Sequence, residues 1–392
     1  MYDVIVVRYG EIALKGQNRS YFVNKLIDNI KNGCKNITDF KIKKTSGRIF
    51  IFPHNNFKKM LDRLKKIPGI VSISPALEVE LEYEELEKKG LKLFENEISD
   101  ADFPVTFRVT TNRANKSFPY TSLQVSKKIG ASILKKFGDQ KLSVDLENPD
   151  YNLNYDIRKN KTYIFVKTIK GPGGLPVGCS GRGLLLLSGG IDSPVAGWQG
   201  MKRGIKVDAL HFHSFPYTSE RAKEKVFKLT KILSQTQVEI QLHICRFTEI
   251  QRAIKQKCDK QFIITIMRRM MIRIANKIAE QNNNQILITG ENIGQVSSQT
   301  LENISVINKV SKIPIIRPLV TMDKEEIINI AKNIGTYKTS IQPYEDCCTI
   351  FVPDHPVTKP TIEMAVENEK KLDIENLVQE AVENTELTTI KE

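Results

Sequence analysis

The apolar positions of the first 75 residues recur at short intervals that mark small strands and helices in alternation. Alternating apolar and polar residues predict strands, and apolar residues at helical spacing predict helices. The predicted strands are 3–8, 40–44, 48–52 and an extended run at 69–75, and the predicted helices are 20–31 and 56–66. The resulting order, strand-helix-strand-strand-helix-strand, is typical of a ferredoxin-like domain over residues 1–75.

Residues 76–170 repeat this mixture and predict a second small domain. The predicted helices are 82–97 and 121–136, and the predicted strands are 104–110, 155–158 and 162–167. Residues 171–183 are rich in glycine and proline. A phosphate-binding loop is the alternative here, but the prolines and the lack of a preceding buried strand favour a linker.

From residue 184 onward, mainly apolar runs alternate with long helical patterns. The predicted strands are 184–187, 207–212, 238–244 and 285–289, and the most regular predicted helices are 222–233, 262–280 and 324–334. This alternation predicts a doubly wound parallel sheet over 184–360, which would bind a ligand beyond the carboxyl ends of its strands. After Pro360 the chain turns acidic, and residues 361–392 are expected to form a loosely attached helix or a disordered tail.

The composition of the 392 residues is typical of a globular protein, with 40% hydrophobic and 27% charged residues. The predicted elements make it an α/β and α+β multidomain protein. No apolar run approaches the roughly 20 residues that span a bilayer, and the first residues read as a strand rather than a signal peptide. A cytoplasmic protein without a membrane partner is therefore expected.

The excess of positive charge lies in residues 1–352. The net charge is +14, and residues 1–180 contain 31 Lys and Arg against 20 Asp and Glu, a balance of +11. Residues 181–352 contribute +9 and residues 353–392 contribute −6. This distribution suits a polyanionic partner, although a Lys-rich but merely solvated surface would give the same numbers.

The clearest chemical motif is Ser188-Gly189-Gly190-Ile191-Asp192-Ser193, which follows the apolar run 184–187. The glycines let the backbone approach an anion, and the start of the next helix directs free N–H groups toward it. Ser188 and Ser193 add hydroxyl donors. The motif lacks the Lys-Ser/Thr ending of a Walker loop. Its pattern resembles the PP-loop of ATP pyrophosphatases, and a glycine-rich turn without a ligand is the alternative.

Several nearby residues are candidates for the same site. Asp192 suits a magnesium ion (Mg²⁺) between its carboxylate and phosphates, or else a helix cap. His211 alternates with His213 on a strand, but without further ligands in register a place beside adenine is favoured over zinc. Gly290 would let a nucleotide ring approach the backbone. Arg268 and Arg269 could reach phosphates, or could be solvated or paired with carboxylates.

The six cysteines are few and unevenly spaced, so no disulfide framework is expected. Cys347 and Cys348 are adjacent and follow the predicted helix 324–334. A thiolate is the usual carrier of transferable sulfur, but Glu345 and Asp346 would oppose the lowered pKa that activates it. Two buried structural cysteines are the alternative.

The motifs together resemble the ThiI family of tRNA 4-thiouridine synthetases. The resemblance rests on the loop, on 290–299, on 315–324 and on the cysteine segment 343–351. It extends to the opening 8–16, similar to the family's ferredoxin-like domain, and to 111–118, similar to its RNA-binding THUMP domain. It implies that ATP activates O4 of a uridine in tRNA, normally position 8, and that a cysteine persulfide supplies sulfur as AMP leaves.

The resemblance also assigns roles to individual residues. It places Asp192 and Lys324 in adenylation and puts the sulfur carrier on Cys347 in an ungapped alignment, or on Cys348 with a one-residue gap. The THUMP likeness suggests RNA contacts at Arg113 and Lys116. The expected nucleotide contacts, besides the loop itself, are Leu186, Leu187, His211, Phe212, Arg268, Gly290 and Gln299.

Partners follow from the same resemblance. Some family members end in a rhodanese domain, and this chain ends after a shorter acidic tail, so a cysteine desulfurase is expected to deliver sulfur directly. The resolving thiol is the neighbouring cysteine, Cys179 or an external reductant. Sulfur transfer to the sulfur carrier protein of thiamine thiazole synthesis, and a homodimer with a second basic face, are left open.

Two other classes of function compete with a tRNA-thiolating enzyme. A different PP-loop enzyme, such as an amide ligase or a tRNA-lysidine synthetase, would not need Cys347. A non-catalytic RNA-binding protein that holds a nucleotide for regulation would not need Asp192 for turnover. Replacement of these residues separates the three hypotheses.

Overall fold

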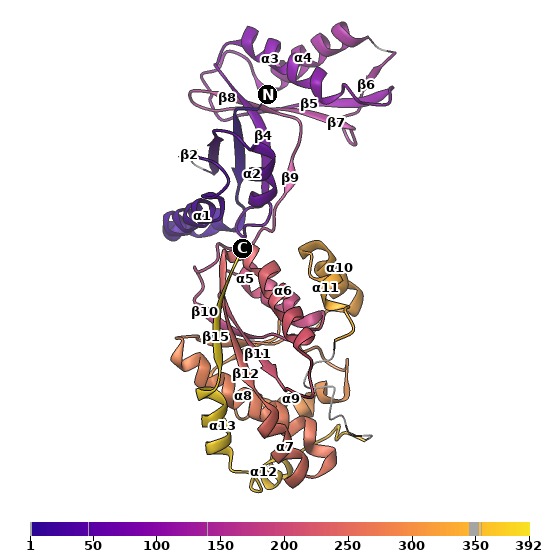
Figure 1. Ribbon diagram of the computed structural model, residues 1–392. Coiled ribbons are helices and arrows are strands. Elements are labelled where there is room, and N and C mark those ends of the chain that lie inside the picture. Colours follow the sequence, from indigo (N-terminus) through magenta and orange to yellow (C-terminus); the bar gives the residue numbers. More distant parts are fainter. Residues whose placement is uncertain (1, 46, 139, 345–352, 354) are drawn as a thin grey trace. The chain divides into compact units, whose positions relative to one another are not determined.

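The computed structural model describes residues 2–392 except 46, 139, 345–352 and 354, and its internal contacts divide the chain into two compact units (Figure 1). The first unit comprises residues 1–16 and 34–173, and the second comprises residues 17–33 and 174–392. The chain passes between the units after Gly16, after Gly33 and after Gly173, and the last of these points lies inside the predicted linker.

The first unit is built on one sheet with the strand order β2-β3-β1-β4-β8-β7-β5-β6, and β9 pairs with β4 off this path. The strands are β1 Val4–Arg8, β2 Phe40–Thr45, β3 Arg48–Pro53, β4 Ser72–Val79, β5 Val105–Arg113, β6 Leu142–Val144, β7 Tyr151–Ile157, β8 Thr162–Phe165 and β9 Ile169–Lys170. The helices are α2 Phe57–Leu64, α3 Tyr83–Glu97 and α4 Ser122–Phe137.

The order β2-β3-β1-β4, with all three pairings antiparallel, is the ferredoxin-like arrangement that the sequence predicts. Strand β4 continues beyond it, because its second half pairs with β8. The predicted boundary at residues 75 and 76 therefore falls inside a strand that both halves of the sheet share. The rings of Phe50 on β3 and Tyr163 on β8 stack with their centroids 4.1 Å apart.

The second unit contains a six-stranded sheet with the order β14-β13-β10-β11-β12-β15. The strands are β10 Arg182–Leu186, β11 Lys206–His213, β12 Glu239–Arg246, β13 Ile286–Ile288, β14 Ile315–Ile316 and β15 Glu386–Lys391. The first five are parallel, so the predicted doubly wound sheet is confirmed.

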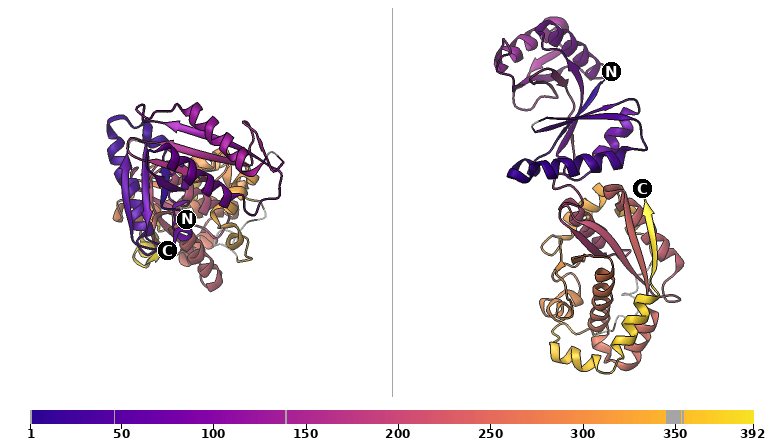
Figure 2. Two further views of the ribbon diagram at one scale, coloured as in Figure 1. Left: turned by 90° about the horizontal axis from the view of Figure 1, so that it is seen from above. Right: turned by 90° about the vertical axis from the view of Figure 1, so that its left-hand side faces the viewer.

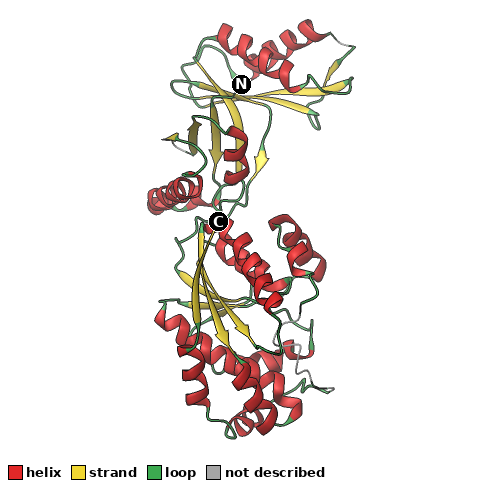
Figure 3. Ribbon diagram, in the orientation of Figure 1, coloured by secondary structure: helices red, strands yellow, loops and turns green. Residues whose placement is uncertain are grey.

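Helices cover both faces of this sheet (Figure 3). The second unit contains α1 Arg19–Cys34, α5 Asp192–Lys202, α6 Glu220–Gln237, α7 Thr248–Lys257, α8 Ile263–Gln281, α9 Leu301–Asn308, α10 Lys324–Ile334, α11 Tyr337–Ser340, α12 Ile362–Glu369 and α13 Ile374–Glu383. Each face has its own apolar core. One core contains residues of α5, α6 and α10, and the other contains residues of α7, α8, α12 and α13. Nowhere in the described chain is a helix both long and apolar enough to cross a membrane.

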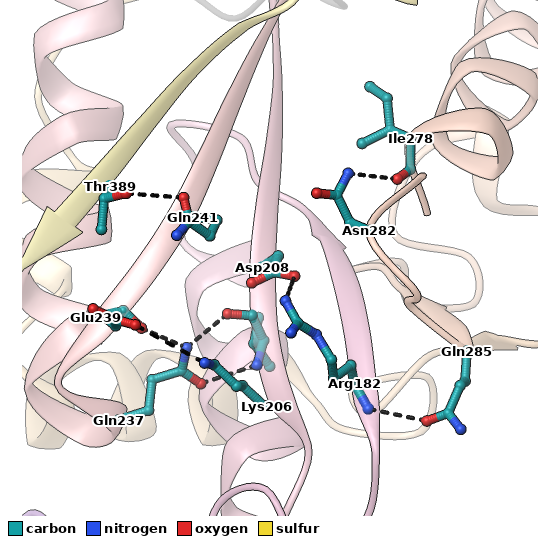
Figure 4. A network of polar contacts seen from close by, with 11 residues as sticks. Arg182, Lys206, Asp208, Gln237, Glu239, Gln241, Ile278, Asn282, Gln285 and Thr389 are labelled. Carbon is teal, nitrogen blue, oxygen red and sulfur yellow. Dashed lines mark hydrogen bonds and ion pairs between the residues drawn. The ribbon is translucent and has the colours of Figure 1, made fainter. Parts of the chain in front are cut away.

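A polar network ties the amino-terminal ends of the central strands together (Figure 4). Arg182 Nη2 donates to Asp208 Oδ2 at 2.8 Å, between β10 and β11. The Gln237 side chain accepts from the N–H of Val207 and donates to the carbonyl oxygens of Val207 and Glu239. These contacts hold the strands in register at one end and leave the carboxyl ends for a ligand site.

The expectation of a loosely attached acidic tail is wrong. Strand β15 pairs antiparallel with β12 over six residues and forms an edge of the sheet (Figure 2). Glu369 of α12 is 3% exposed and accepts two hydrogen bonds each from Arg269 and Arg273. The overall acidity hid an amphipathic pattern, because the apolar residues Ala365, Leu372, Val378, Ala381 and Val382 are buried.

Candidate active site

The Ser-Gly-Gly motif forms the turn between β10 and α5, where the strand order of the second sheet reverses. Strand β10 lies between β11 and β13, so the chain leaves β10 toward one side of the sheet and later returns to the other. Such a switch point opens a crevice at the carboxyl ends of the strands. A pocket of about 240 Å³ lies here. It is smaller than the roughly 300–1,000 Å³ of pockets that enclose a whole ligand, so a nucleotide would extend beyond it.

Two serines shape the turn from within. Ser193 Oγ accepts a hydrogen bond from Ser188 N at 2.9 Å and lies 3.0 Å from Ser188 Oγ. Gly190 N donates to Ser188 Oγ at 3.3 Å. The serine hydroxyls therefore stabilise the loop as well as offering donors. Helix α5 begins at Asp192, directly after the turn, so its first N–H groups point toward the same place.

The structure brings most of the predicted nucleotide contacts together. Beside the predicted residues, Met271, Thr289 and Glu291 also line the pocket, and sequence reasoning assigned none of them to it. The predicted residues that line it are Leu186, Leu187, Ser188, Gly190, Asp192, Ser193, His211, Phe212, Arg268, Gly290 and Gln299. Gly189 is the central residue of the turn itself.

One wall of the pocket is set by β11. His211 is 4% exposed, and its Nδ1 lies 3.0 Å from the carbonyl oxygen of Leu187. Phe212 packs edge-on against Phe247, with ring centroids 5.1 Å apart. These contacts fix both side chains before any ligand arrives. The buried amide oxygen of Gln299 has no hydrogen-bond partner among the described residues, so it is an available acceptor.

Gly290 is also required for a reason that the sequence did not suggest. A Cβ at this position would lie 2.7 Å from Ser193 N and 2.8 Å from the Asp192 carbonyl carbon. The backbone at Gly290 therefore lies close to the first turn of α5. The predicted approach of a nucleotide to Gly290 stays a prediction. Gly290 lets the end of β13 pack against the helix start that forms the anion site.

We expect Gly290→Ala to weaken ATP binding about 10- to 100-fold. Forcing an extra carbon into this contact costs about 1–3 kcal/mol, and the first turn of α5 must move to relieve it. Equilibrium binding of ATP measures the effect. Gly130→Ala is the matched control, since nothing lies within 4 Å of its added Cβ. Unchanged ATP affinity in a folded Gly290→Ala variant would contradict this account.

A buried carboxylate orients the arginines of the site. Glu291 is 4% exposed and accepts hydrogen bonds from Arg268 Nη1 at 2.8 Å and Arg317 Nε at 2.7 Å. Burial alone would raise the pKa of Glu291, but the two guanidinium groups outweigh burial and hold the pKa below its ordinary value. Arg268 is thus paired and held at the pocket. Arg269 cannot reach phosphates, because it is 2% exposed and bound to Glu369.

Asp192 and Lys324 meet at the mouth of the pocket, although 132 residues separate them. Lys324 Nζ lies 2.6 Å from Asp192 Oδ1, and Gln295 Nε2 donates to Asp192 Oδ2 at 3.1 Å. Lys324 is the first residue of α10, which an Asp323–Glu326 capping box stabilises. The two side chains remain 22% and 44% exposed, so a ligand can reach both.

The cysteine pair lies outside the described residues, but the chain on both sides of it is anchored. Lys225 Nζ donates to the carbonyl oxygen of Gln342 at 2.9 Å. On the other side, Asn303 Nδ2 donates to the carbonyl oxygen of Val357 at 3.0 Å and also to that of Ser297. Ser297 begins the 3₁₀ turn Ser297–Gln299, whose last residue lines the pocket.

The predicted RNA-binding residues lie in the first unit. Arg113 ends β5, and its guanidinium donates to the carbonyl oxygens of Phe118 and Tyr120, so it holds the following loop together. Lys116 is exposed in that loop. Lys116 is therefore free to meet a polyanion, whereas Arg113 shapes the segment that presents it.

Three family models match the chain. One described as the ThiI ferredoxin-like domain matches residues 4–74, one described as the THUMP domain matches residues 81–167, and one described as thiamine biosynthesis protein (ThiI) matches residues 178–374. Together they match well over half of the 392 residues.

Relatives and solved structures are similar over most or all of their length. Probable tRNA sulfurtransferases of Halothermothrix orenii and Caldanaerobacter subterraneus are 54% and 49% identical, with 100% and 98% of this chain and 100% of each relative covered. A 4-thiouridine synthetase crystallised with RNA and ATP is 39% identical, with a TM-score of 0.91 and both chains fully covered. PH1313 from Pyrococcus horikoshii is 28% identical, with a TM-score of 0.67 over 85% of this chain and 99% of that one.

Proposed function

Because the chain belongs to the ThiI family, we propose how its pocket and its cysteine pair divide the work of tRNA thiolation. The protein is an ATP-dependent tRNA sulfurtransferase that forms 4-thiouridine. The observation that carries the mechanism is the Ser-Gly-Gly turn at the switch point of the sheet, where the start of α5, Asp192 and Lys324 converge.

ATP occupies the pocket with its base against the wall formed by β11 and its phosphates at the turn. His211 and Phe212 are already fixed there by contacts within the protein. Backbone N–H groups of the turn and of the first turn of α5 bind the phosphate oxygens. In the first step, O4 of the uridine attacks the α-phosphorus, the bond to the β-phosphate oxygen breaks, and pyrophosphate leaves.

The negative charge of the phosphates is stabilised at the mouth of the pocket. Lys324 lies where it can bind a phosphate oxygen, and Asp192 orients it through their ion pair. Arg268, held by Glu291, adds a second positive group. Both cations are placed in advance, so little reorganisation is needed as charge develops on the leaving pyrophosphate.

The residues present fit a magnesium ion held by one carboxylate and by phosphate oxygens. Asp192 would hold it, because Glu291 is already engaged by two arginines. The described residues form no group of three side chains that could hold a metal by themselves. Bound magnesium would neutralise phosphate charge, and its usual coordination through one or two carboxylates and substrate phosphates matches this donor set.

Cys347 or Cys348 carries the sulfur. Its persulfide attacks C4 of the activated uridine, and AMP departs with the oxygen. A second thiol then attacks the sulfur of the carrier cysteine and breaks its bond to the transferred sulfur. This releases 4-thiouridine and leaves a disulfide that an external reductant must reduce. The anchored flanks of the segment support this assignment, because Asn303 ties Val357 to the turn that contains Gln299.

The substrate partner is tRNA, and uridine 8 is the proposed position. The first unit supplies RNA binding through its THUMP portion, and a cysteine desulfurase supplies the persulfide. We also propose that the enzyme works in the cytoplasm, where tRNA and the desulfurase are available, and that a homodimer presents a second basic face.

The test is complete reconstitution. The protein is incubated with ATP, magnesium, cysteine, a cysteine desulfurase and unmodified tRNA, and 4-thiouridine is measured by nucleoside mass spectrometry. The expected result is a tRNA-borne product that requires ATP and the desulfurase. Release of AMP without incorporation of sulfur would sustain adenylation and refute the sulfur route, and the absence of both with active donor would refute the mechanism.

A further inference from the structure

Three arginines gather at one end of the face of the first unit's sheet that carries Phe50 and Tyr163. Arg8 ends β1, Arg48 begins β3, and Arg158 follows directly after β7. They come from strands far apart in the sequence and surround a single carboxylate, Asp156. The proposed mechanism uses none of these four residues.

The contacts show that Asp156 serves mainly one of the three arginines. Arg158 Nη2 donates to Asp156 Oδ2 at 2.9 Å, and Arg158 Nε lies 2.9 Å from Oδ1 as an ion-pair contact. Arg48 Nε is 3.7 Å from Asp156 Oδ2. Arg8 donates to the neutral hydroxyl of Ser74 at 2.9 Å, and its guanidinium lies 4.6 Å from the ring centroid of Phe165.

The cluster has two positive charges in excess. Burial and the neighbouring charge of Arg48 lower the pKa of Arg8 to about 10, and Asp156 opposes this only in part. The charges of the three guanidinium groups repel one another. Uncompensated charge that is partly removed from water is costly unless an anion joins it.

The guanidinium groups of the cluster are closer to solvent than the carboxylate. The side chain of Asp156 is only 5% exposed, whereas those of Arg48 and Arg158 are 23% and 21% exposed. The carboxylate therefore lies beneath the guanidinium groups. Arg48 Nε is buried without a hydrogen-bond partner among the described residues, so the protein does not fully satisfy this guanidinium group.

The cluster adjoins the loop that contains Lys116. Strands β5 and β7 pair as far as Arg113 and Ile157, and Ala114 N donates to the carbonyl oxygen of Ile157 at 2.9 Å. Asn115 Nδ2 donates to the carbonyl oxygen of Lys159, the residue after Arg158. The arginines thus extend the basic surface that the sequence assigned to RNA.

We propose that Arg8, Arg48 and Arg158 form a site for a phosphodiester group of the bound tRNA. Guanidinium groups present planar pairs of donors that match phosphate oxygens, and such backbone contacts set the register of a protein on its nucleic acid. The inference rests on the proposed function only in taking tRNA as the polyanion.

The test compares the salt dependence of tRNA affinity for the full-length wild type and for Arg48→Gln and Arg158→Gln, without ATP or sulfur donor. Each phosphate contact contributes roughly 0.7–0.9 to the slope of log K against log salt. We expect each variant to reduce the slope by about that amount, with unchanged ATP binding. Arg48→Gln should also keep its Tm, whereas Arg158→Gln should lower the Tm because it leaves the buried Asp156 carboxylate without its main partner. Lys88→Gln, which removes an exposed charge from α3, is the control and should leave the slope almost unchanged.

Asp156→Asn separates binding from a purely structural role. At a phosphate site, removal of the competing carboxylate strengthens tRNA binding, whereas a structural cluster loses Tm and gains no affinity. Unchanged slopes for both arginine variants overturn the proposal. An equal reduction of the slope in Lys88→Gln also overturns it. Inorganic phosphate could raise the Tm of the wild type but not that of Arg48→Gln while the two proteins bind tRNA equally well. That result also overturns the proposal. A failure of the proposed function would appear instead as absence of 4-thiouridine from the wild type.

Discussion

Asp192→Asn is expected to reduce tRNA-dependent pyrophosphate release by about 100- to 1,000-fold, the usual loss when one preorganised electrostatic group is removed. Asparagine keeps the shape of the side chain and a hydrogen-bonding oxygen but removes the charge that holds Lys324 and that would bind magnesium. ATP affinity should change only a few-fold, because the turn and the start of α5 remain. Pyrophosphate release and equilibrium ATP binding, measured on the same preparation, separate the two effects.

The stability cost of this substitution should be small. An ion pair between side chains as exposed as these contributes about 0–1 kcal/mol, so a lost fold cannot explain a large kinetic effect. Asp259→Asn is the matched control, since Asp259 also pairs with a lysine, Lys371, at 2.8 Å in the second unit. It should leave pyrophosphate release intact.

The pair can be divided further with Lys324→Gln and the double variant. If Asp192 acts only by orienting Lys324, the double variant will be no slower than the worse single variant. If Asp192 also binds magnesium, the losses will accumulate and the magnesium dependence will change in Asp192→Asn alone. Full activity of Asp192→Asn would remove Asp192 from the mechanism.

Replacement of the sulfur-carrying cysteine is expected to reduce 4-thiouridine to background while tRNA-dependent pyrophosphate release continues. The ungapped alignment favours Cys347→Ser as this variant, with Cys348→Ser as the alternative. Adenylation needs no thiol, whereas sulfur transfer cannot occur without one. Nucleoside mass spectrometry and pyrophosphate release together identify the step that fails.

The buried cysteines are suitable controls. Burial raises the pKa of Cys245 to about 12 and that of Cys258 to about 11, so neither forms a thiolate near neutral pH. Cys258→Ala should therefore keep both activities. Cys179→Ser tests whether Cys179 is the resolving thiol. If this variant turns over more slowly than the wild type only when reductant is limiting, Cys179 has that role. Retention of 4-thiouridine by a variant lacking both Cys347 and Cys348 would place the sulfur elsewhere.

Much of the fold was predictable because its signals are local. Apolar runs of four to seven residues identified the strands β10 to β13, and helix 324–334 was predicted to the residue. The prediction of a loosely attached tail over residues 361–392 was wrong, because it relied on the average charge of the segment and not on the periodicity of its apolar residues. Its apolar residues at helical spacing, such as Val378 and Val382, were the signal that could have revealed α13.

The amino-acid sequence by itself determined the phosphate loop and the side of the sheet on which the site would form. A strand, a tight glycine turn and a helix start are adjacent along the chain, so their chemistry needs no distant partner. The cysteine pair was likewise visible as a motif, and its role stays a prediction.

Only the tertiary structure decided which charges meet. Glu291 with Arg317, Asp192 with Lys324, Glu369 with Arg269, and Asp156 with Arg48 lie 26, 132, 100 and 108 residues apart. Along the chain each is an ordinary charged residue, and its pairing depends on strand order and helix packing. Burial then makes the pairing consequential, because a charge removed from water must find a partner within a few ångströms.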